Sequence, residues 1–295
     1  MTEATLADKT PATASGTGLA AWLAPALTLA LFAVVFAKPA ALLARDWWND
    51  PEAGHGLLLF PAAVWLVWKR GLRPDRAGQP FLGLFLLAGA VLLRVASDLA
   101  SELFTMRLAL VGAAGALVVF YFGFRQLLAW WLPVILLVLA IPLPELLRSA
   151  LALPLQFKAS QLGAALLESR NVPVSLTGNV IIMPNGHRLF VTEACSGLRS
   201  LTALISLAVL MGGLWLRSPW VRVALVVLAV PIAVLINGVR VFLTGFLVFF
   251  VDPKLGEGFM HLTEGWLLFV VSLTLIGAVA WLLSFLDRRL GRAAA

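Results

Sequence analysis

The main pattern along the chain is a series of long apolar stretches separated by short polar segments. Each stretch approaches the ~20 residues that a helix needs to cross a bilayer, although the second is short. The seventh is too long for one plain span. It contains Pro231 and the polar run 237–240, which predict a break or a bend there. The eight stretches lie at 20–37, 55–69, 80–96, 103–122, 126–143, 198–216, 220–250 and 264–285.

The composition points to the same class of protein. The 295 residues are 61% hydrophobic and 13% charged, with a mean hydropathy of +0.96. Soluble proteins are not this apolar, so we predict an all-α polytopic membrane protein with about eight transmembrane helices. Membrane topology accounts for the net charge of +7 better than nucleic-acid binding does, so we expect no nucleic-acid partner. Residues 1–18 lack the regions of a signal peptide and are expected to form a disordered cytoplasmic tail.

The basic residues predict one orientation in the membrane. With the N-terminus inside, the cytoplasmic segments hold 11 of the 22 basic residues but only four of the 15 acidic ones. The cluster at 69–76 and the Arg-rich C-terminus agree with this orientation. We therefore expect a multi-pass protein of the cytoplasmic (inner) membrane with both termini cytoplasmic and Cys195 at the outer face. Residues 19–287 would form one integral-membrane domain, followed by a basic cytoplasmic tail at 288–295.

The longest segment between spans, about 144–197, falls on the outer side in this topology. Residues 146–168 carry apolar side chains at helical spacing among polar ones, which favours a helix lying in the membrane interface. Residues 172–182 and 187–192 alternate or are β-branched, and Pro-Asn-Gly at 184–186 separates them. This pattern predicts a small extracytoplasmic β-hairpin that leads into Cys195.

Cys195 is the only cysteine, which excludes an intramolecular disulfide and a cysteine-cluster metal site. It stands where a polar stretch meets the apolar span 198–216, and so at the N-terminus of a predicted membrane helix. The free N–H groups and partial positive charge of a first helical turn favour thiolate over thiol and can face a developing anion. The position therefore suits a nucleophile beside an oxyanion site. Taken alone, however, a single cysteine is more often a small buried hydrophobe.

The same topology brings further polar residues to the outer boundary of the membrane. They are His55, Arg199, Asn237, Arg240 and His261. Each has a simpler interpretation, because an arginine can extend to the headgroups and a histidine can sit in the interface. Arg199 lies four residues after the cysteine and could favour the thiolate, or pair with Glu193 or a phosphate. Together, one Cys, one His and one Arg beside a helix terminus form a complete set for acyl transfer.

Three segments, in this order, resemble the signatures of the exosortase/archaeosortase family. They are Glu193-Ala-Cys195-Ser-Gly197-Leu-Arg199-Ser, Asn237-Gly-Val-Arg240 and His261-Leu-Thr-Glu-Gly265-Trp. The Gly178-Asn179-Val180-Ile181 stretch and His55-Gly56 are also similar to family elements, and the resemblance covers about residues 45–285. It implies a membrane transpeptidase whose active site faces outward, with the triad Cys195, Arg240 and His261.

The resemblance also implies the substrates and the roles of the site residues. Substrates would be membrane-anchored exported proteins with a C-terminal sorting signal: a short motif such as Pro-Glu-Pro, a membrane helix and a basic cluster. Cys195 would attack, Arg240 and the N–H groups around Ser196 and Gly197 would stabilise the oxyanion, and His261 would protonate the leaving amine. Supporting roles fall to Glu193, Ser196, Gly197, Arg199, Asn237 and His55. No cofactor or metal is expected, and membrane lipid is an expected partner.

Two departures from the family pattern affect these expectations. Ala53-Gly54 stands where relatives commonly have Tyr-Ser, which makes a role for His55 less secure. Many relatives carry a C-terminal soluble domain, so any such accessory partner is expected to be a separate protein. Alternatives remain open: an intramembrane cysteine protease without transfer, a transporter, or an assembly factor for exopolysaccharide export. A transporter is disfavoured because no inverted repeat is evident and Cys195 would have no role.

Overall fold

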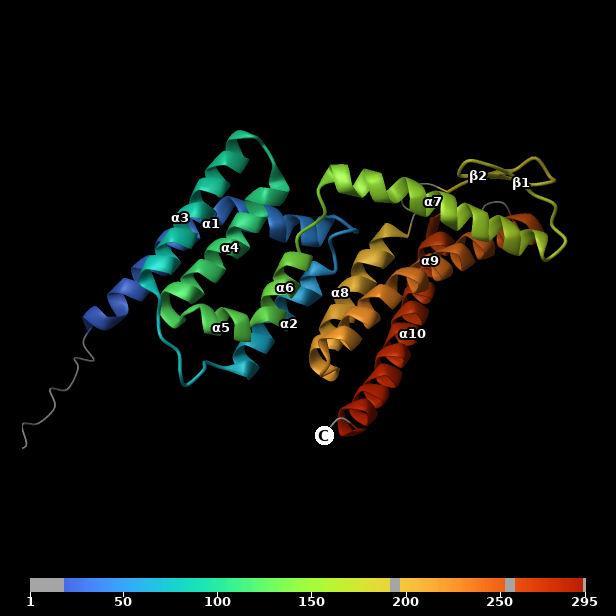
Figure 1. Cartoon of the computed structure of the whole chain (residues 1–295). Coiled ribbons are helices and arrows are strands. Elements are labelled where there is room, and N and C mark those ends of the chain that lie inside the picture. Colours follow the sequence, from blue (N-terminus) through green and yellow to red (C-terminus); the bar gives the residue numbers. More distant parts are fainter. Residues whose placement is uncertain (1–18, 192–196, 253–257, 294–295) are drawn as a thin grey trace, which may run out of the picture.

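The computed structural model describes the backbone of residues 19–191, 197–252 and 258–293, and the side chains of residues 22–191, 197–252 and 267–288. These residues are mainly helical (Figure 1). The helices are α1 (Leu19–Asn49), α2 (Gly56–Arg70), α3 (Pro80–Leu99), α4 (Leu103–Phe122), α5 (Phe124–Ala129), α6 (Trp131–Leu139), α7 (Glu145–Glu168), α8 (Leu198–Trp215), α9 (Pro219–Phe250) and α10 (Gly258–Ala293). The predicted helical membrane fold is confirmed.

Six helices in the described part of the chain are long and apolar enough to cross a membrane: α1, α3, α4, α8, α9 and α10. The predicted count of eight spans is not confirmed. The second apolar stretch forms α2, which has 15 residues, and the fifth is divided between α5 and α6 at Trp130. An apolar stretch of that length can equally be a helix buried in a protein core. Toward the other end, α10 continues to Ala293 and so includes the first residues of the predicted basic tail.

The sequence predicts a break or a bend in the seventh stretch, and the break is wrong, because α9 is one continuous helix of 32 residues across Pro231 and Asn237-Gly238. The bend stays a prediction. Pro231 removes one helical hydrogen bond, a loss that neighbouring helices in a membrane bundle can accommodate. Asn237 and Gly238 are buried by packing. A Cβ on Gly238 would stand 2.6 Å from the Leu162 side chain of α7, so the polar run marks a close helix crossing.

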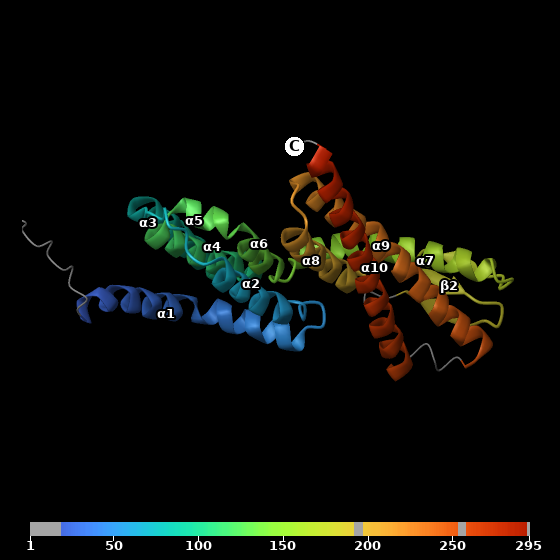
Figure 2. The ribbon, with the colours of Figure 1, turned by 90° about the horizontal axis from the view of Figure 1, so that it is seen from below.

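The helices form two groups, an N-terminal group (α1–α6) and a C-terminal group (α7–α10), which lie side by side in Figures 1 and 2. Helix α6 packs against α8 and joins them. Leu59, Leu66 and Leu132 of the N-terminal group are buried in one cluster, against which Val209 and Leu210 of α8 pack. The two groups therefore share an apolar contact near the middle of the molecule.

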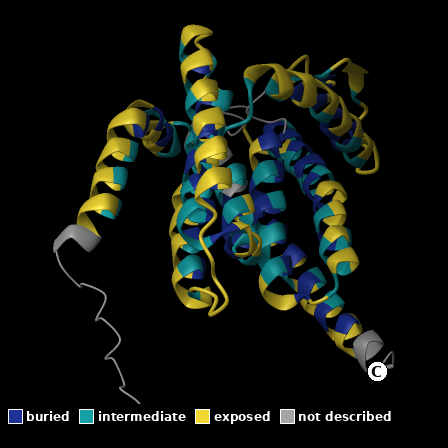
Figure 3. Cartoon of the chain, turned by 60° about the vertical axis from the view of Figure 1, so that its left-hand side comes forward, coloured by how far each residue is buried: buried dark blue, intermediate teal, exposed yellow. Residues whose placement is uncertain are grey.

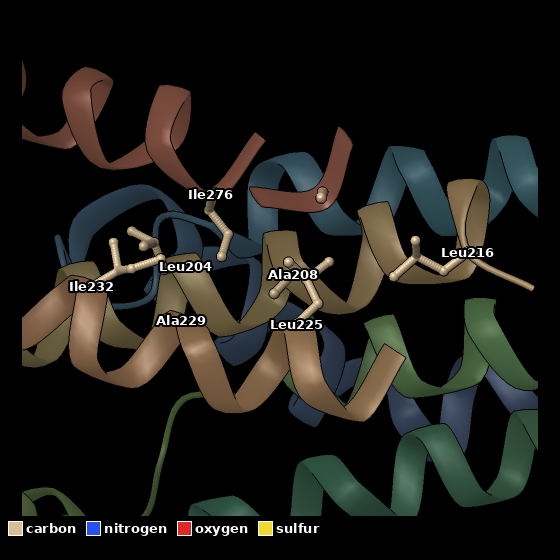
Figure 4. Close-up of a cluster of buried hydrophobic side chains, with 8 residues drawn as sticks. Leu204, Ala208, Leu216, Leu225, Ala229, Ile232 and Ile276 are labelled. Carbon is tan, nitrogen blue, oxygen red and sulfur yellow. The ribbon is translucent and has the colours of Figure 1, made fainter. Parts of the chain in front are cut away.

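The core of the C-terminal group is a three-helix contact. Leu204 and Ala208 of α8, Leu225 of α9 and Ile276 of α10 are buried together (Figure 4). Large apolar side chains cover the outward sides instead, as at Phe81, which is 92% exposed. Figure 3 shows this distribution, with buried positions between the helices and exposed positions along their outer faces. Such an apolar exterior suits a lipid environment.

The segment between α6 and α8 forms the expected helix and a small sheet. Helix α7 covers 145–168, as predicted, and packs on α9, where a Cβ on Gly163 would stand 2.5 Å from the Val241 side chain. The sheet has three antiparallel strands in the order β1 (Ser175–Thr177), β2 (Val180–Ile182) and β3 (Arg188–Phe190). The predicted hairpin is β2–β3. The first predicted strand is divided in two, because Gly178-Asn179 makes a second tight turn with Gly178 at φ 63°.

Candidate active site

The first motif meets the second at one close contact, between Gly197 and Asn237. Gly197 precedes the first turn of α8 with φ 80°, a backbone conformation that glycine adopts most readily. A Cβ on this residue would stand 2.7 Å from the side-chain carbon Cγ of Asn237 on α9. Both the conformation and the space therefore require glycine. The contact fixes the start of α8 against the part of α9 that carries Arg240.

Apolar packing from three helices holds the start of α8 in place. Leu198 and Leu201 of α8 are buried with Ala152 of α7 and Ala233 of α9. The Leu201 N–H donates to the Gly197 carbonyl at 2.9 Å, which begins the helix. Packing against α7 and α9 thus fixes the position of the first turn of α8.

The two candidate arginines occupy different settings. Arg240 is half-buried on α9, one turn beyond Asn237, which is 6% exposed. Its backbone carbonyl accepts a hydrogen bond from the Thr244 hydroxyl at 3.0 Å. Arg199 is exposed in the first turn of α8. Arg240 therefore lies within the helix packing, whereas the Arg199 side chain is exposed.

A cavity of about 300 Å³ lies between the two helix groups, beside the start of α8. Its walls come from the α1–α2 connection, from α4, from the end of α6, from α7 and from the first turns of α8. The polar and charged residues lining it are Asp50, Glu52, His55, Arg148, Arg199, Thr202 and Ser206. The structure thus brings His55 and Arg199 to one cavity. Arg240 is not among its lining residues.

His55 connects two walls of this cavity. Its Nδ1 lies 3.1 Å from the Glu52 carbonyl oxygen and its Nε2 lies 3.0 Å from the Leu139 carbonyl oxygen, at the end of α6. Trp47 makes a parallel connection, donating from Nε1 to the Ala140 carbonyl at 2.7 Å. Both ring nitrogens of His55 thus face backbone carbonyls. This geometry indicates that His55 positions the cavity wall.

Arg148 and Glu52 are site residues that the sequence prediction missed. They pair at 3.3 Å, and Arg148 also pairs with Glu145 within α7. The hydrogen bond from Arg148 lowers the pKa of the Glu145 carboxyl. Arg148 and Glu145 are three residues apart, a helical spacing visible in the sequence. The Glu52 pairing spans 96 residues, so no local pattern reveals it.

Four predicted site residues cannot be placed in full. Glu193, Cys195 and Ser196 lie outside the described residues. His261 lies in the first turns of α10 by its backbone, and its side chain is outside what the structure describes.

A second hollow, of about 890 Å³, lies at the opposite end of the C-terminal group. It is lined by 214–218 at the α8–α9 turn and by Asp287 and Arg288 of α10. The Asp287 carboxylate accepts the backbone N–H groups of Arg217 and Ser218, at 2.7 and 3.2 Å. It therefore ties the α8–α9 turn to α10. None of the predicted site residues whose side chains the structure describes lines this hollow.

Comparison with known proteins identifies the family. The family model for the transmembrane exosortase (Exosortase_EpsH) matches residues 47–278, which is most of the chain. No curated protein matches the chain, and no solved structure does. The matched range includes all three motifs and helices α2 to α9. With its helical membrane fold and the contact between its first two motifs, the chain belongs to the transmembrane exosortase family.

Proposed function

We propose that this exosortase is a membrane cysteine transpeptidase. It cleaves the C-terminal sorting signal of exported proteins, a Pro-Glu-Pro type motif followed by a membrane helix and a basic cluster. It then transfers the cleaved protein to an envelope acceptor. The contact between Gly197 and Asn237 carries this proposal. Two peptide bonds join Cys195 to Gly197, so covalent geometry limits their Cα separation to about 7.6 Å. The same contact fixes the segment of α9 that bears Arg240.

The proposed reaction has two stages. The Cys195 thiolate attacks the carbonyl carbon of the scissile peptide bond, and Arg240 with backbone N–H groups near Ser196 and Gly197 stabilises the oxyanion. The carbon–nitrogen bond then breaks, and His261 gives its proton to the leaving amine. A thioester on Cys195 remains. An acceptor amine, or water, attacks it, the carbon–sulfur bond breaks, and the proton of the nucleophile passes to His261.

Glu193, Arg199 and His55 support this chemistry in the proposal. Glu193 stands two residues before the nucleophile, Arg199 four residues after it, and His55 holds a cavity wall beside α8. The confinement of the substrate's own membrane helix beside the bundle would orient the scissile bond.

The experiment that tests the reaction is co-expression with a tagged reporter that ends in such a sorting signal. The reporter recovered from membranes is measured by intact mass. We expect loss of the C-terminal helix, with added acceptor mass for transfer or a free carboxylate for hydrolysis. A reporter that keeps its full mass in the presence of folded exosortase would contradict the proposal. The co-expression is carried out in the native host, which supplies any separate accessory protein.

The proposed orientation puts the site on the outer face of the cytoplasmic membrane. The basic loop 69–76 lies at the end of the molecule opposite α7 (Figure 1). Lys and Arg in short loops favour the cytoplasmic side. An impermeant thiol reagent on intact cells should label Cys195 in the native chain. It should not label Arg76→Cys made in the Cys195→Ala background, and the reverse pattern would overturn the orientation.

A further inference from the structure

The cavity beside α8 is mainly apolar, yet charged and titratable side chains also line it. Its apolar wall comes from the end of α6 and from α7 and α8. Five lining residues are charged or titratable: Asp50, Glu52, His55, Arg148 and Arg199. Ligand sites commonly combine apolar walls with a few polar groups that fix orientation. The question is which of these five is available to a ligand.

Four of the five already have partners within the protein. Asp50 accepts the Glu52 backbone N–H at 2.9 Å. Glu52 pairs with Arg148, which also pairs with Glu145 of α7. Both nitrogens of His55 face carbonyl oxygens. These groups build the walls of the cavity.

Arg199 differs from the other four. Its side chain is exposed, and no carboxylate among the described residues forms an ion pair with it. It projects from the first turn of α8, four residues after Cys195 in the sequence. A guanidinium at the edge of an apolar cavity is suited to a carboxylate, which it can bind through two parallel hydrogen bonds.

The cavity size limits what can enter. The volume equals that of about ten water molecules at ~30 Å³ each. A cavity of this volume accommodates a few side chains of an extended peptide.

We propose that this cavity is a specificity subsite for an acidic residue of the substrate, flanked by apolar residues, and that Arg199 pairs with its carboxylate. The inference rests on the proposed function, because it assigns the recognition of the sorting motif to this cavity. The apolar walls enclose the flanking residues, and Arg199 selects the acidic side chain. Arg240 is not a lining residue, so recognition and oxyanion stabilisation belong to different arginines.

The test is a double-mutant cycle on processing rate. Native and Arg199→Gln proteins are each assayed with reporters that carry Pro-Glu-Pro or Pro-Gln-Pro. With the native protein, the change of Glu to Gln should slow processing roughly tenfold, the scale of one lost charged hydrogen bond. Arg199→Gln should slow the Glu reporter by a similar factor, and the two changes together should add little further loss. Arg199→Lys should retain much of the preference for Glu.

A matched control is Arg217→Gln, which alters an exposed arginine at the opposite end of the C-terminal group. It should leave the preference for Glu over Gln unchanged. If Arg199 instead only favours the Cys195 thiolate, Arg199→Gln will slow both reporters equally and lower the rate of thiol alkylation. Equal slowing would overturn the inference, and so would a preference of the native protein for a Pro-Lys-Pro reporter.

A binding measurement separates this inference from the proposed function. Purified Cys195→Ala protein in nanodiscs is titrated with synthetic peptides that contain Pro-Glu-Pro or Pro-Gln-Pro. Tighter binding of the Glu peptide, lost in the Cys195→Ala, Arg199→Gln double variant, supports the subsite whether or not cleavage occurs. Equal binding of both peptides, or no binding of either, overturns the subsite. Processing that depends on Cys195 but not on the Glu residue would leave the function in place and remove the subsite.

Discussion

The two helix groups are stabilised by different contacts. In the N-terminal group, ion pairs connect one helix to another: Lys38 of α1 with Asp98 of α3, and Asp46 of α1 with Arg107 of α4. Glycines allow close approach in both groups, as at Gly83 of α3 and Gly163 of α7, and in the C-terminal group one such contact, at Gly197, joins two family motifs. The first two family motifs both lie in the C-terminal group, whereas the N-terminal group supplies a cavity wall. We therefore expect changes at Gly197 and Arg240, in the C-terminal group, to affect the chemical step, and changes at the cavity, including the wall that the N-terminal group supplies, to affect substrate binding.

The largest effect is expected at Arg240. Arg240→Lys should reduce processing nearly as much as Arg240→Ala, by at least ~100-fold, the usual scale for an oxyanion donor. Lysine cannot reproduce the fixed paired donors of a guanidinium. The measurement is kcat on the reporter, compared with Arg222→Lys on the same helix.

Arg222 donates to the Leu216 carbonyl at the opposite end of α9, at 3.0 and 2.9 Å, so its lysine variant should remain active. If Arg240→Lys is mild while Arg199→Lys is inactive, the roles of Arg199 and Arg240 are reversed. The comparison of the two helix groups would survive that result, because both residues belong to the C-terminal group.

The second-largest loss of processing is expected at the contact between the first two motifs, where Gly197 meets Asn237. Gly197→Ala adds a Cβ 2.7 Å from Asn237 to a residue at φ 80°, so α8 and α9 must separate. We expect processing to fall at least ~10-fold, since misplaced catalytic groups cost rate steeply. Gly186→Ala is the control, because Gly186 has φ 82° and an added Cβ would meet nothing within 4 Å. It should show only the strain of the backbone conformation, so equal losses in both variants would argue against a special role for the Asn237 contact.

A smaller effect is expected at His55, in the N-terminal group. His55→Ala removes the contacts to the Glu52 and Leu139 carbonyls and should loosen the cavity wall. We expect KM to rise roughly fivefold, the scale of one lost hydrogen bond, with kcat nearly unchanged. His187→Ala, at an exposed position in the turn between β2 and β3, should change neither quantity. A collapse of kcat in His55→Ala would instead make His55 part of the chemistry.

The smallest effect is expected from the ion pair within α7. Because Arg148 lowers the pKa of Glu145, the pair stabilises the folded protein above the ordinary pKa of a glutamate, and this contribution is lost as pH falls through the lowered value. Glu145→Gln should therefore lower the Tm slightly at neutral pH, with the difference from native shrinking under acid conditions. Glu145 is solvent-exposed, so the change will be small. A Tm difference that grows on acidification would contradict this assignment.

The length of each apolar stretch along the sequence predicts much of the fold. Stretches near 20 residues become α3, α4 and α8 almost to the residue. The wrong predictions concern apolar stretches whose length alone does not determine the helices that they form. The second stretch is too short to assign by length, and Trp130 divides the fifth, which no Pro or Gly within 126–132 announces. In α9, Pro231 and Asn237 suggested a break, but packing against α7 and Gly197 maintains the helix.

The candidate site was predictable where motif and chemistry coincide. Gly197, Asn237 and Arg240 fall in short ordered motifs, and the structure places the first two in contact. The cavity was not predictable, because it forms between α1–α2, α6 and α8, which are far apart in the sequence. The pairing of Glu52 with Arg148 and the bond from Trp47 to Ala140 are likewise long-range contacts. Single-residue patterns do not contain that information.

The central claim is that the segment joined to Gly197 supplies a nucleophilic thiol. The most direct measurement is trapping of a covalent intermediate between the reporter and the exosortase, detected as an adduct on the peptide containing Cys195. We predict an adduct whose mass equals the cleaved reporter, released by hydroxylamine as a thioester is, and absent from folded Cys195→Ala protein, which should also leave the reporter at full length. Processing by Cys195→Ala at close to the native rate would contradict the claim and exclude thiol chemistry.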